Sequence, residues 1–177
     1  MTPTDIATLL EQQFGSAITG KKLDALDPFV TVESAKLVEV CVFLRDDARL
    51  KFELLNDITG VDYLETDAKK AAKAGFEPHL EVLYHLSSFS FPGRRFTLKL
   101  MLPRWKGDKA GELPEIPSVA HIWRTADWHE RETYEMYGIL FTGHPDLRRI
   151  LLSEDWIGYQ LRKDYEFPLE YHGIRGR

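Results

Sequence analysis

The chain has 177 residues, a length typical of one domain, and 44% of them are hydrophobic, which predicts a single core. Its formal net charge of −5 argues against a general nucleic-acid binder, because such domains usually carry a basic excess. Cys41 is the one cysteine, so no internal disulfide can form and an iron–sulfur cluster would lack ligands. A reducing compartment fits this composition.

The beginning of the chain predicts a short amphipathic helix rather than a basic signal peptide. Thr2 or Thr4 is placed to cap this helix and Gly15 to end it. No apolar run approaches the ~18 to 20 residues that span a bilayer, so we expect membrane contact only through a partner. Residues 29–32 follow a turn and predict a first strand.

The next segment is apolar on both faces of an extended pattern. Residues 36–44 alternate valine and leucine with other apolar residues, which predicts a central strand. Asp46 or Asp47 is then expected to cap a helix that ends at Gly60. A short strand is expected over residues 61–64.

A hairpin is predicted in the middle of the chain. Residues 66–75 are small and charged, which indicates an exposed excursion of high helix propensity. Residues 80–89 and 95–102 predict two antiparallel strands, joined by a turn at residues 91–94 that contains proline and glycine. The alternation in the second strand predicts one face covered by helices.

The last predicted helix follows a loop over residues 103–117. Ser118 is placed to cap it, and the helical period continues to Gly138, with room for a break near Asp127.

Together these elements predict an α+β fold, a two-layer sandwich of a mostly antiparallel sheet with helices on one face and an extended C-terminal tail. We expect residues 1–145 to form the α+β part and residues 146–177 to form a docking tail of the same single domain.

Residues 128–164 mix charged and aromatic side chains in a way that suits neither a core nor a plain surface. Arg131 and Glu135 lie one helical turn apart, which predicts an ion-pair network. A solvated helix face would explain such charges alone. Trp128 and Tyr137 crowd the same turns, so we expect contacts with a partner chain or with the following loop. Paired catalytic carboxylates are a further alternative.

His144 precedes a proline and is therefore expected at a sharp corner of extended backbone. Pro145 suits the first position of a short helix with Asp146 near its positive end. The other histidines show no spacing of metal ligands, so a hydrogen-bonded structural role is expected for His144. A free-standing acid–base enzyme would pair His144 with Asp146 or Glu135.

Two basic pairs follow, Arg148-Arg149 and Arg162-Lys163, with acidic residues between them. Arginine forks that reach carboxylates of another subunit fit these mixed signs. A nucleic-acid adaptor that uses the two pairs is the alternative, although the acids disfavour it. The chain has no glycine-rich phosphate loop, which argues against a nicotinamide or flavin site.

The sequence ERETYEMYGILFTGHPDLRRIL, residues 130–151, resembles the signature of the C subunit of proton-pumping NADH:quinone oxidoreductase, respiratory complex I. The matching positions are Glu130, Arg131, Glu132, Glu135, Met136, Tyr137, His144, Arg148, Ile150 and Leu151. The sequence DWIGYQLRKD, residues 155–164, is similar to the family's D-W-x-G-x-P-L-R-K-D. It departs at Gln160, where the family usually has proline, and at Tyr159, which is often histidine or tryptophan.

This resemblance implies a peripheral-arm subunit with an α+β domain and no cofactor of its own. NADH, FMN, iron–sulfur clusters and quinone would be bound elsewhere in the assembled complex. The implied partners are the D subunit, which helps to form the quinone site, and the B and I subunits, at the cytoplasmic side of the inner membrane. Related subunits occur in photosynthetic NDH complexes, membrane-bound hydrogenases and formate hydrogenlyases, which stay open as alternatives.

We expect no catalytic, cofactor or metal residues in the chain, and docking residues in the segment of the resemblance. The expected docking residues are Trp128, Glu130, Arg131, Glu132, Glu135, Tyr137, His144, Arg148, Arg149, Trp156, Arg162, Lys163 and Asp164.

Overall fold

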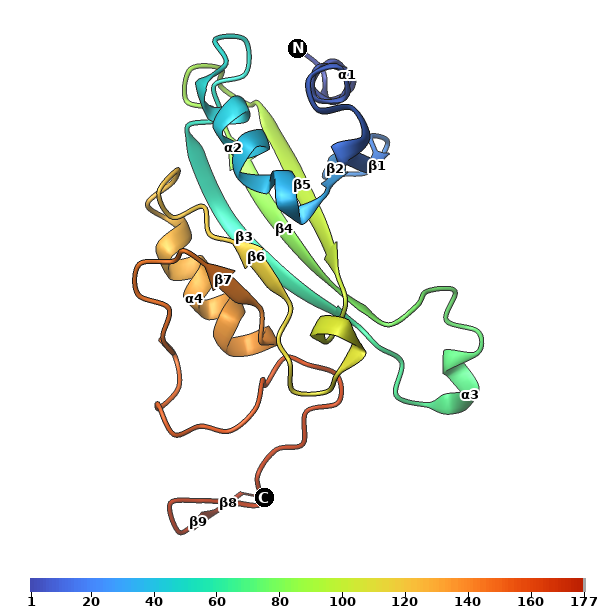
Figure 1. Ribbon diagram of the computed structural model, residues 1–177, viewed down its shortest axis with the longest axis vertical. Helices are drawn as coiled ribbons and strands as arrows, with labels where there is room; N and C mark the ends of the chain where they lie inside the picture. Colours follow the sequence, from blue (N-terminus) through green and yellow to red (C-terminus); the bar gives the residue numbers. More distant parts are fainter. Residues whose placement is uncertain (177) are drawn as a thin grey trace.

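The computed structural model describes residues 1–176, in which a five-stranded sheet carries helices on one face and an irregular tail leaves the sheet at its far end (Figure 1). The helices are α1 (Pro3–Phe14), α2 (Leu37–Asp46), α3 (Ala68–Ala71) and α4 (Ala126–Tyr137). Single 3₁₀ turns lie at Gly15–Ala17, Ser34–Lys36 and Lys106–Asp108. The strands are β1 (Ile18–Lys22), β2 (Phe29–Val32), β3 (Leu54–Tyr63), β4 (His79–Ser87), β5 (Arg95–Leu102), β6 (Glu115–Pro117), β7 (Leu140–Thr142), β8 (Glu170–Tyr171) and β9 (Ile174–Arg175).

The main sheet has the strand order β1-β2-β5-β4-β3. Within this sheet only the β2–β5 pair is parallel, so the predicted α+β fold with a mostly antiparallel sheet is confirmed. The predicted hairpin is also confirmed, because β4 and β5 pair from Leu80↔Leu102 to Ser87↔Arg95. Two further pairs form small separate sheets, β6 with β7 and β8 with β9.

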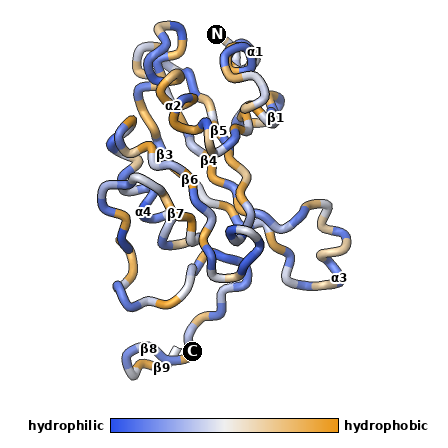
Figure 2. Tube along the Cα trace, viewed as in Figure 1, coloured by the Kyte–Doolittle hydropathy of each residue, from blue (hydrophilic) through white to orange (hydrophobic). Residues whose placement is uncertain are grey.

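One continuous core lies between the helices and the inner face of the sheet. Alternate residues of β4 and β5 point into it, as the sequence predicts for β5. Figure 2 shows hydrophobic positions along α2 and the central strands. The largest fully buried side chains are Tyr84, Phe52, Phe96, Phe141, Ile6, Leu10, Leu37, Leu44, Leu50, Leu55, Leu80 and Leu86.

Helix α1 begins and ends where the sequence predicts. The Thr2 hydroxyl accepts a hydrogen bond from the backbone N–H of Asp5 and the Asp5 carboxylate accepts one from the N–H of Thr2, a complete capping box. The helix ends at Gly15, whose φ of 54° favours glycine. The exposed excursion between β3 and β4 is confirmed as well, and it holds the one-turn helix α3 (Figure 1).

The predicted strand over residues 36–44 is wrong, because this segment forms helix α2. Its fully buried residues, Leu37, Val40, Cys41 and Leu44, follow the i, i+3, i+4, i+7 spacing of a helix. Half-buried apolar side chains flank this stripe, and they gave the segment the two-sided hydrophobicity of a central strand. Burial against the sheet outweighs the strand preference of the valines.

The helix predicted between Asp46 and Gly60 is also wrong. A loop follows α2, and β3 then runs through Gly60 and includes residues 61–63 of the short strand predicted at residues 61–64. Ile58, Gly60 and Asp62 alternate on the inner face. Gly60 does not end a helix; it makes room for the ring of Tyr137 on α4.

Helix α4 is shorter than predicted. Residues 118–125 form turns rather than helix, the helix starts at Ala126, and it ends at Gly138 in the left-handed conformation, as predicted. Strands β6 and β7 on either side of α4 were not predicted. The short helix predicted at Pro145 is absent from the described residues, where a turn stands in its place.

The outer edge of β3 and the residues just before it are covered by side chains from α4 and the turn before it. The indole of Trp123 donates to the carbonyl of Phe52 at 3.0 Å, and the hydroxyl of Thr125 donates to that of Leu55 at 2.9 Å. From α4, the hydroxyl of Thr133 donates to the carbonyl of Ile58 at 3.4 Å. These donors occupy an edge that would otherwise offer free backbone groups to another chain. Within residues 1–176, no helix is long and apolar enough to cross a membrane.

Replacing Gly60 with alanine should destabilise the fold. The added Cβ would lie 2.4 Å from the Tyr137 ring, so the ring and α4 must shift, at a cost of about 1 to 3 kcal/mol. The control is Gly20→Ala in β1, where the new Cβ would lie 3.4 Å from the Thr31 hydroxyl. Urea unfolding measures both variants, and equal midpoints would contradict the role assigned to Gly60.

Candidate functional site

Residues 128–164 join helix α4 to a tail with almost no regular secondary structure. Beyond β7, the described chain has only turns and the two-residue strands β8 and β9. Backbone groups outside helices and sheets still need hydrogen-bond partners when they are buried. Side chains from α4, from β3 and from the loop after β5 supply them.

Glu135 binds the tail through three consecutive backbone amides. Its carboxylate is fully buried and accepts from the N–H of Ile150 at 3.0 Å, of Leu151 at 2.7 Å and of Leu152 at 2.8 Å. The Arg149 guanidinium lies 3.8 Å from the same carboxylate and adds positive charge. A buried carboxylate is stable only with such donors, so the tail and Glu135 depend on each other.

Arg131, one turn before Glu135, binds carbonyl groups of the same stretch. Its guanidinium donates to the carbonyl of Arg148 at 3.2 Å and to that of Arg149 at 3.4 Å. The Trp128 ring lies 5.6 Å from this guanidinium. Arg131 and Glu135 therefore do not pair with each other as predicted. Arg131 binds carbonyl groups of the tail, and Glu135 binds its amides.

Arg162 closes the C-terminal end of α4. Its side chain is buried and donates to the carbonyl of Tyr137 at 2.7 Å and to that of Gly138 at 3.3 Å, where the helix dipole favours a cation. The Trp105 ring packs against the guanidinium at 3.8 Å. Burial, followed by the nearby Arg104, lowers the pKa of Arg162 from its ordinary value.

The two departures from the family pattern lie beside this contact. The Tyr159 ring packs on Gly138 so closely that a Cβ there would lie 2.7 Å from it. Gln160 is half-buried, and its backbone N–H makes no hydrogen bond within the described chain. Because proline lacks that N–H, exchanging proline and glutamine at this position alters no backbone hydrogen bond.

A charged cluster holds the next two residues of the tail to the sheet. Asp62, buried on β3, accepts from the Arg104 guanidinium at 2.8 and 2.9 Å and from the backbone N–H of Lys163 at 2.8 Å. Arg104 also donates to Asp164 at 2.7 Å. This hydrogen bond lowers the pKa of Asp164. Lys163 contributes its backbone here and its side chain remains exposed.

Glu130 faces the core and not the tail. Its carboxylate accepts from the Ser118 hydroxyl at 2.6 Å and from the backbone N–H of Val119 at 2.7 Å, and it is fully buried. Burial raises the pKa of Glu130 to about 7, against the effect of these two hydrogen bonds, and the nearby Asp127 raises it further.

His144 is a hydrogen-bonded corner residue, as predicted. Its Nδ1 accepts from the backbone N–H of Asp146 at 3.0 Å, which places the proton on Nε2, 3.0 Å from the carbonyl of Asp127. The ring is fully buried, and Glu130 lies 4.0 Å from it. With both nitrogens engaged inside the protein, this geometry favours the structural role over acid–base chemistry.

Trp156 organises the end of the tail. Its indole N–H donates to the Tyr165 hydroxyl at 3.0 Å, and its ring packs against Phe167 and Tyr171, with centroids 5.7 and 4.7 Å away. This aromatic cluster gives the hairpin of β8 and β9 a small packing centre of its own.

The expected docking residues therefore divide into two sets. Those whose side chains are buried or half-buried and contact other parts of this chain are Glu130, Arg131, Glu135, Tyr137, His144, Arg149, Trp156 and Arg162. Those that are exposed are Trp128, Glu132, Arg148, Lys163 and Asp164. The contacts within the chain do not test docking itself, which stays a prediction for all thirteen.

Sequence reasoning missed the partners of the buried charges. Asp62, Arg104 and Ser118 are separated from the side chains and backbone they bind by 12 to 101 positions. The one available signal was Asp62, which alternates with Ile58 and Gly60 on an otherwise apolar face of β3. Among the described residues, no group of three or more histidine, cysteine or acidic side chains could hold a metal ion.

Fold and site together define a class: an α+β domain whose charged helix holds its own C-terminal tail. Residues 30–171 match the family described as the respiratory-chain NADH dehydrogenase 30 Kd subunit. The chain belongs to this family, which provides the C subunit of NADH-quinone oxidoreductase, an enzyme complex. The resemblance found in the sequence is thereby confirmed.

Similar proteins agree with this membership. The C subunit of NADH-quinone oxidoreductase from Chloroherpeton thalassium is 40% identical over 168 residues, which cover 94% of this chain and 62% of that protein. The C subunit from Chlorobium phaeobacteroides is 39% identical, with 94% of this chain and 90% of that protein covered. The chain thus spans less than two thirds of the first relative and most of the second.

Solved structures share the fold. A trypsin-resistant fragment of Nqo5 has a TM-score of 0.59 and 26% identity, covering 80% of this chain and 98% of the fragment. A chain of the membrane-bound sulfane sulfur reductase, an archaeal respiratory membrane complex, has a TM-score of 0.62. Its identity is 23% over 92% of this chain and 85% of that one, which shows the fold alone.

Replacing Glu130 with glutamine should remove a pH dependence of stability. The carboxyl has a pKa of about 7 in the folded chain and near 4.5 when unfolded, so its contribution is complete below pH 4.5 and is lost as pH rises through 7. The loss is on the order of 3 kcal/mol. We expect urea unfolding to show that the unmodified chain loses stability as the pH rises from 5 to 8. The Glu130→Gln variant should not show this loss, so its free energy of unfolding should rise relative to that of the unmodified chain.

The control for this comparison is Glu132→Gln, which removes an exposed carboxylate from the same helix. Its unfolding free energy should follow the unmodified chain at each pH. If the unfolding free energy of Glu130→Gln changed with pH in the same way as that of the unmodified chain and of Glu132→Gln, burial would not raise the pKa of Glu130.

Replacing Glu135 with glutamine should release the tail while the sheet stays folded. Hydrogen bonds to charged groups contribute about 1.5 to 3 kcal/mol each, and the amide loses charge from three of them. Hydrogen exchange of the amides of residues 150–152 should accelerate at least about tenfold. Unchanged exchange there, with Glu132→Gln as the reference, would refute the role of Glu135.

Proposed function

We propose that this chain is a non-catalytic subunit of the peripheral arm of a proton-translocating NADH:quinone oxidoreductase. In this proposal it supports assembly of the electron-transfer arm beside the D subunit at the quinone site and near the B and I subunits. Membership in the family and the chemistry of the tail support this role. The exposed apolar side chains of the tail are the observation that carries it.

These side chains are exposed in the isolated chain, although the backbone of Leu151 and of Leu161 is hydrogen-bonded to α4. The exposed apolar residues of the tail are Leu151 (61% exposed), Ile157 (87%), Leu161 (51%), Phe167 (64%), Leu169 (88%) and Ile174 (74%). Large apolar groups in such a series usually mark a surface that another protein covers. The aromatic and arginine residues between them are the types enriched at such interfaces.

Exposed charged residues occur in the same segment of the chain. Glu132 comes from α4, Arg148 and Lys163 come from the tail, and Trp128 on α4 is a further exposed aromatic residue. Among residues 1–176, the side chain of Arg148 forms an ion pair only with the exposed Asp146, at 2.9 Å, a contact of little energy in water. Exposed charges and exposed apolar side chains thus alternate along this segment, and subunit interfaces commonly combine the two.

The cofactors of the complex belong to other subunits in this proposal. NADH, FMN, the iron–sulfur clusters and quinone would be bound there, and this chain would reach the cytoplasmic side of the inner membrane only through its partners. An equivalent place in a membrane-bound hydrogenase, a formate hydrogenlyase or a photosynthetic NDH complex is the alternative. Affinity purification separates them, because NADH-module subunits indicate complex I and a nickel–iron large subunit indicates a hydrogenase.

Replacing Ile157 and Leu169 with serine should weaken assembly without unfolding the chain. Both side chains are almost fully exposed, so the isolated chain loses little packing, whereas a partner would lose two apolar contacts. The amount of the D subunit that co-purifies with the tagged chain measures the effect, and we expect it to fall at least about tenfold.

The matched control is Leu26→Ser, a 97% exposed leucine in the loop between β1 and β2. This variant should retain the D subunit. If the tail variant also retains it, the tail is not the docking surface. If even the unmodified chain brings no partner with it, the proposed function is wrong.

A further inference from the structure

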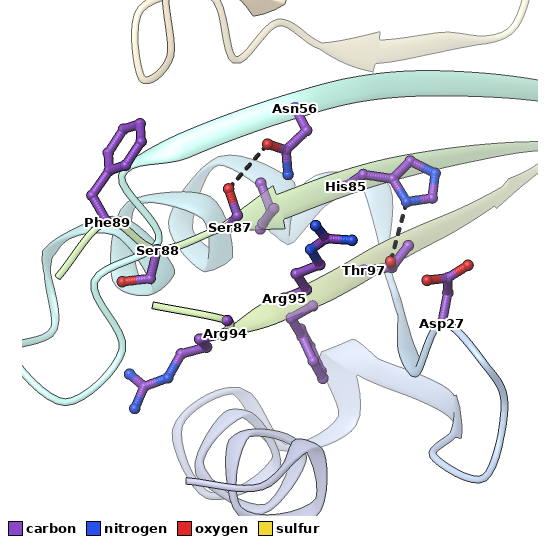
Figure 3. Close-up of a pocket in the computed structure, with 12 residues that line it drawn as sticks. Asp27, Asn56, His85, Ser87, Ser88, Phe89, Arg94, Arg95 and Thr97 are labelled. Carbon is purple, nitrogen blue, oxygen red and sulfur yellow. Dashed lines mark hydrogen bonds between the residues drawn. The ribbon is translucent and has the colours of Figure 1, made fainter. Parts of the chain in front are cut away.

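An open cleft of about 550 Å³ is lined by no residue of the signature segment, residues 128–164, and lies at one end of β3, β4 and β5 next to the β4–β5 turn (Figure 3). The polar residues that line it are Asp27, Asn56, His85, Ser87, Ser88, Arg94, Arg95 and Thr97. Of these, His85, Ser87, Arg95 and Thr97 stand on the face of the sheet opposite the helices, since the alternate residues of β4 and β5 fill the core.

Three neighbouring strands bring hydrogen-bond donors to this cleft. Ser87 on β4 is directly opposite Arg95 on β5, and His85 is opposite Thr97. Asn56 occupies the register shift between Leu55 and Asp57 on β3. A bulge of this kind re-aims a side chain, and here it turns Asn56 towards Ser87.

The hydrogen bonds within the cleft leave its donors available. The Asn56 carbonyl oxygen accepts from the Ser87 hydroxyl at 3.0 Å, so the amide NH₂ group of Asn56 remains for another acceptor. Nδ1 of His85 lies 3.3 Å from the Thr97 hydroxyl. In the tautomer in which this hydroxyl donates to Nδ1, the proton is on Nε2, which can then donate to a ligand. Both groups suit an incoming acceptor.

Arg95 supplies the positive charge. Its side chain is exposed, and no ion pair or side-chain hydrogen bond engages its guanidinium among residues 1–176. The adjacent Arg94 differs, because its guanidinium donates to the carbonyls of Arg49 and Leu50 and lies over the Phe91 ring. Figure 3 shows Arg94 turned away from the cleft and Arg95 within it.

We propose that this cleft binds an anionic group, a carboxylate or a phosphate. The Arg95 guanidinium supplies the charge and a forked donor geometry, and the Asn56 amide and the His85 ring add neutral donors. Asp27 lies across the cleft and repels anions, so it limits their affinity. No residue of the signature segment takes part, so this site is independent of the proposed docking of the tail.

The test is an NMR titration of the full chain with inorganic phosphate and, separately, with a tetraglutamate peptide. We expect saturable shifts of the Asn56 side-chain amide and of the backbone amides of Ser87 and Arg95. Saturation by phosphate alone identifies a phosphate site, and saturation by the peptide alone or by both identifies carboxylate recognition. No saturable shift with either ligand overturns the proposal.

Two variants and a control make the titration specific. Arg95→Gln should weaken binding at least about tenfold, and Asp27→Asn should tighten it. Arg124→Gln is the matched control, since Arg124 is exposed and lies outside the cleft. Equal affinity of Arg95→Gln and Arg124→Gln, with unfolding midpoints unchanged, would also overturn the proposal.

Discussion

The carboxylate of Glu135 is the contact on which the C-terminal part of the structure depends. A buried carboxylate without donors would be costly, and three consecutive inward-facing amides without an acceptor would be costly too. The chain resolves both problems with one contact, because the amides of residues 150–152 converge on Glu135. Arg131 binds the carbonyls just before them, and Arg162 returns the chain to the end of α4. Side chains of α4 thereby give the tail backbone the hydrogen-bond partners that a neighbouring strand would otherwise supply.

In this tail, several polar groups are buried and several large apolar side chains are exposed, the reverse of the usual distribution. Backbone groups of residues 148–152 and the side chain of Arg162 bind α4, while Ile157, Leu169 and Ile174 are exposed. These exposed apolar groups contribute no burial to the isolated chain. The position of the tail depends on charge-assisted hydrogen bonds and on the aromatic cluster around Trp156. The exposed apolar groups gain by association only when another surface covers them.

The sequence predicted local features well and long-range ones poorly. Helix α1, the β4–β5 hairpin and the end of α4 at Gly138 follow from capping residues, strand alternation and glycine conformation, all of which act over a few positions. Helix α2 was mistaken for a strand, because its apolar residues fill both the alternating positions of a strand and the i, i+3, i+4, i+7 positions of a helix. The segment of the site was evident from its motif. Its internal partners Asp62 and Arg104 were not, because pairing across 60 to 101 positions leaves no local pattern.

The buried charges also change how docking of this segment should be understood. Read from sequence, the mixed charges of residues 128–164 suggested ion pairs across a subunit boundary. In the folded chain Glu135, Arg131 and Arg162 are already desolvated and bonded internally. A partner therefore need not desolvate them again, and it meets a tail whose backbone is already fixed. Since ordering a flexible segment opposes association, a tail held in advance by its own helix leaves more of the apolar contact energy for binding.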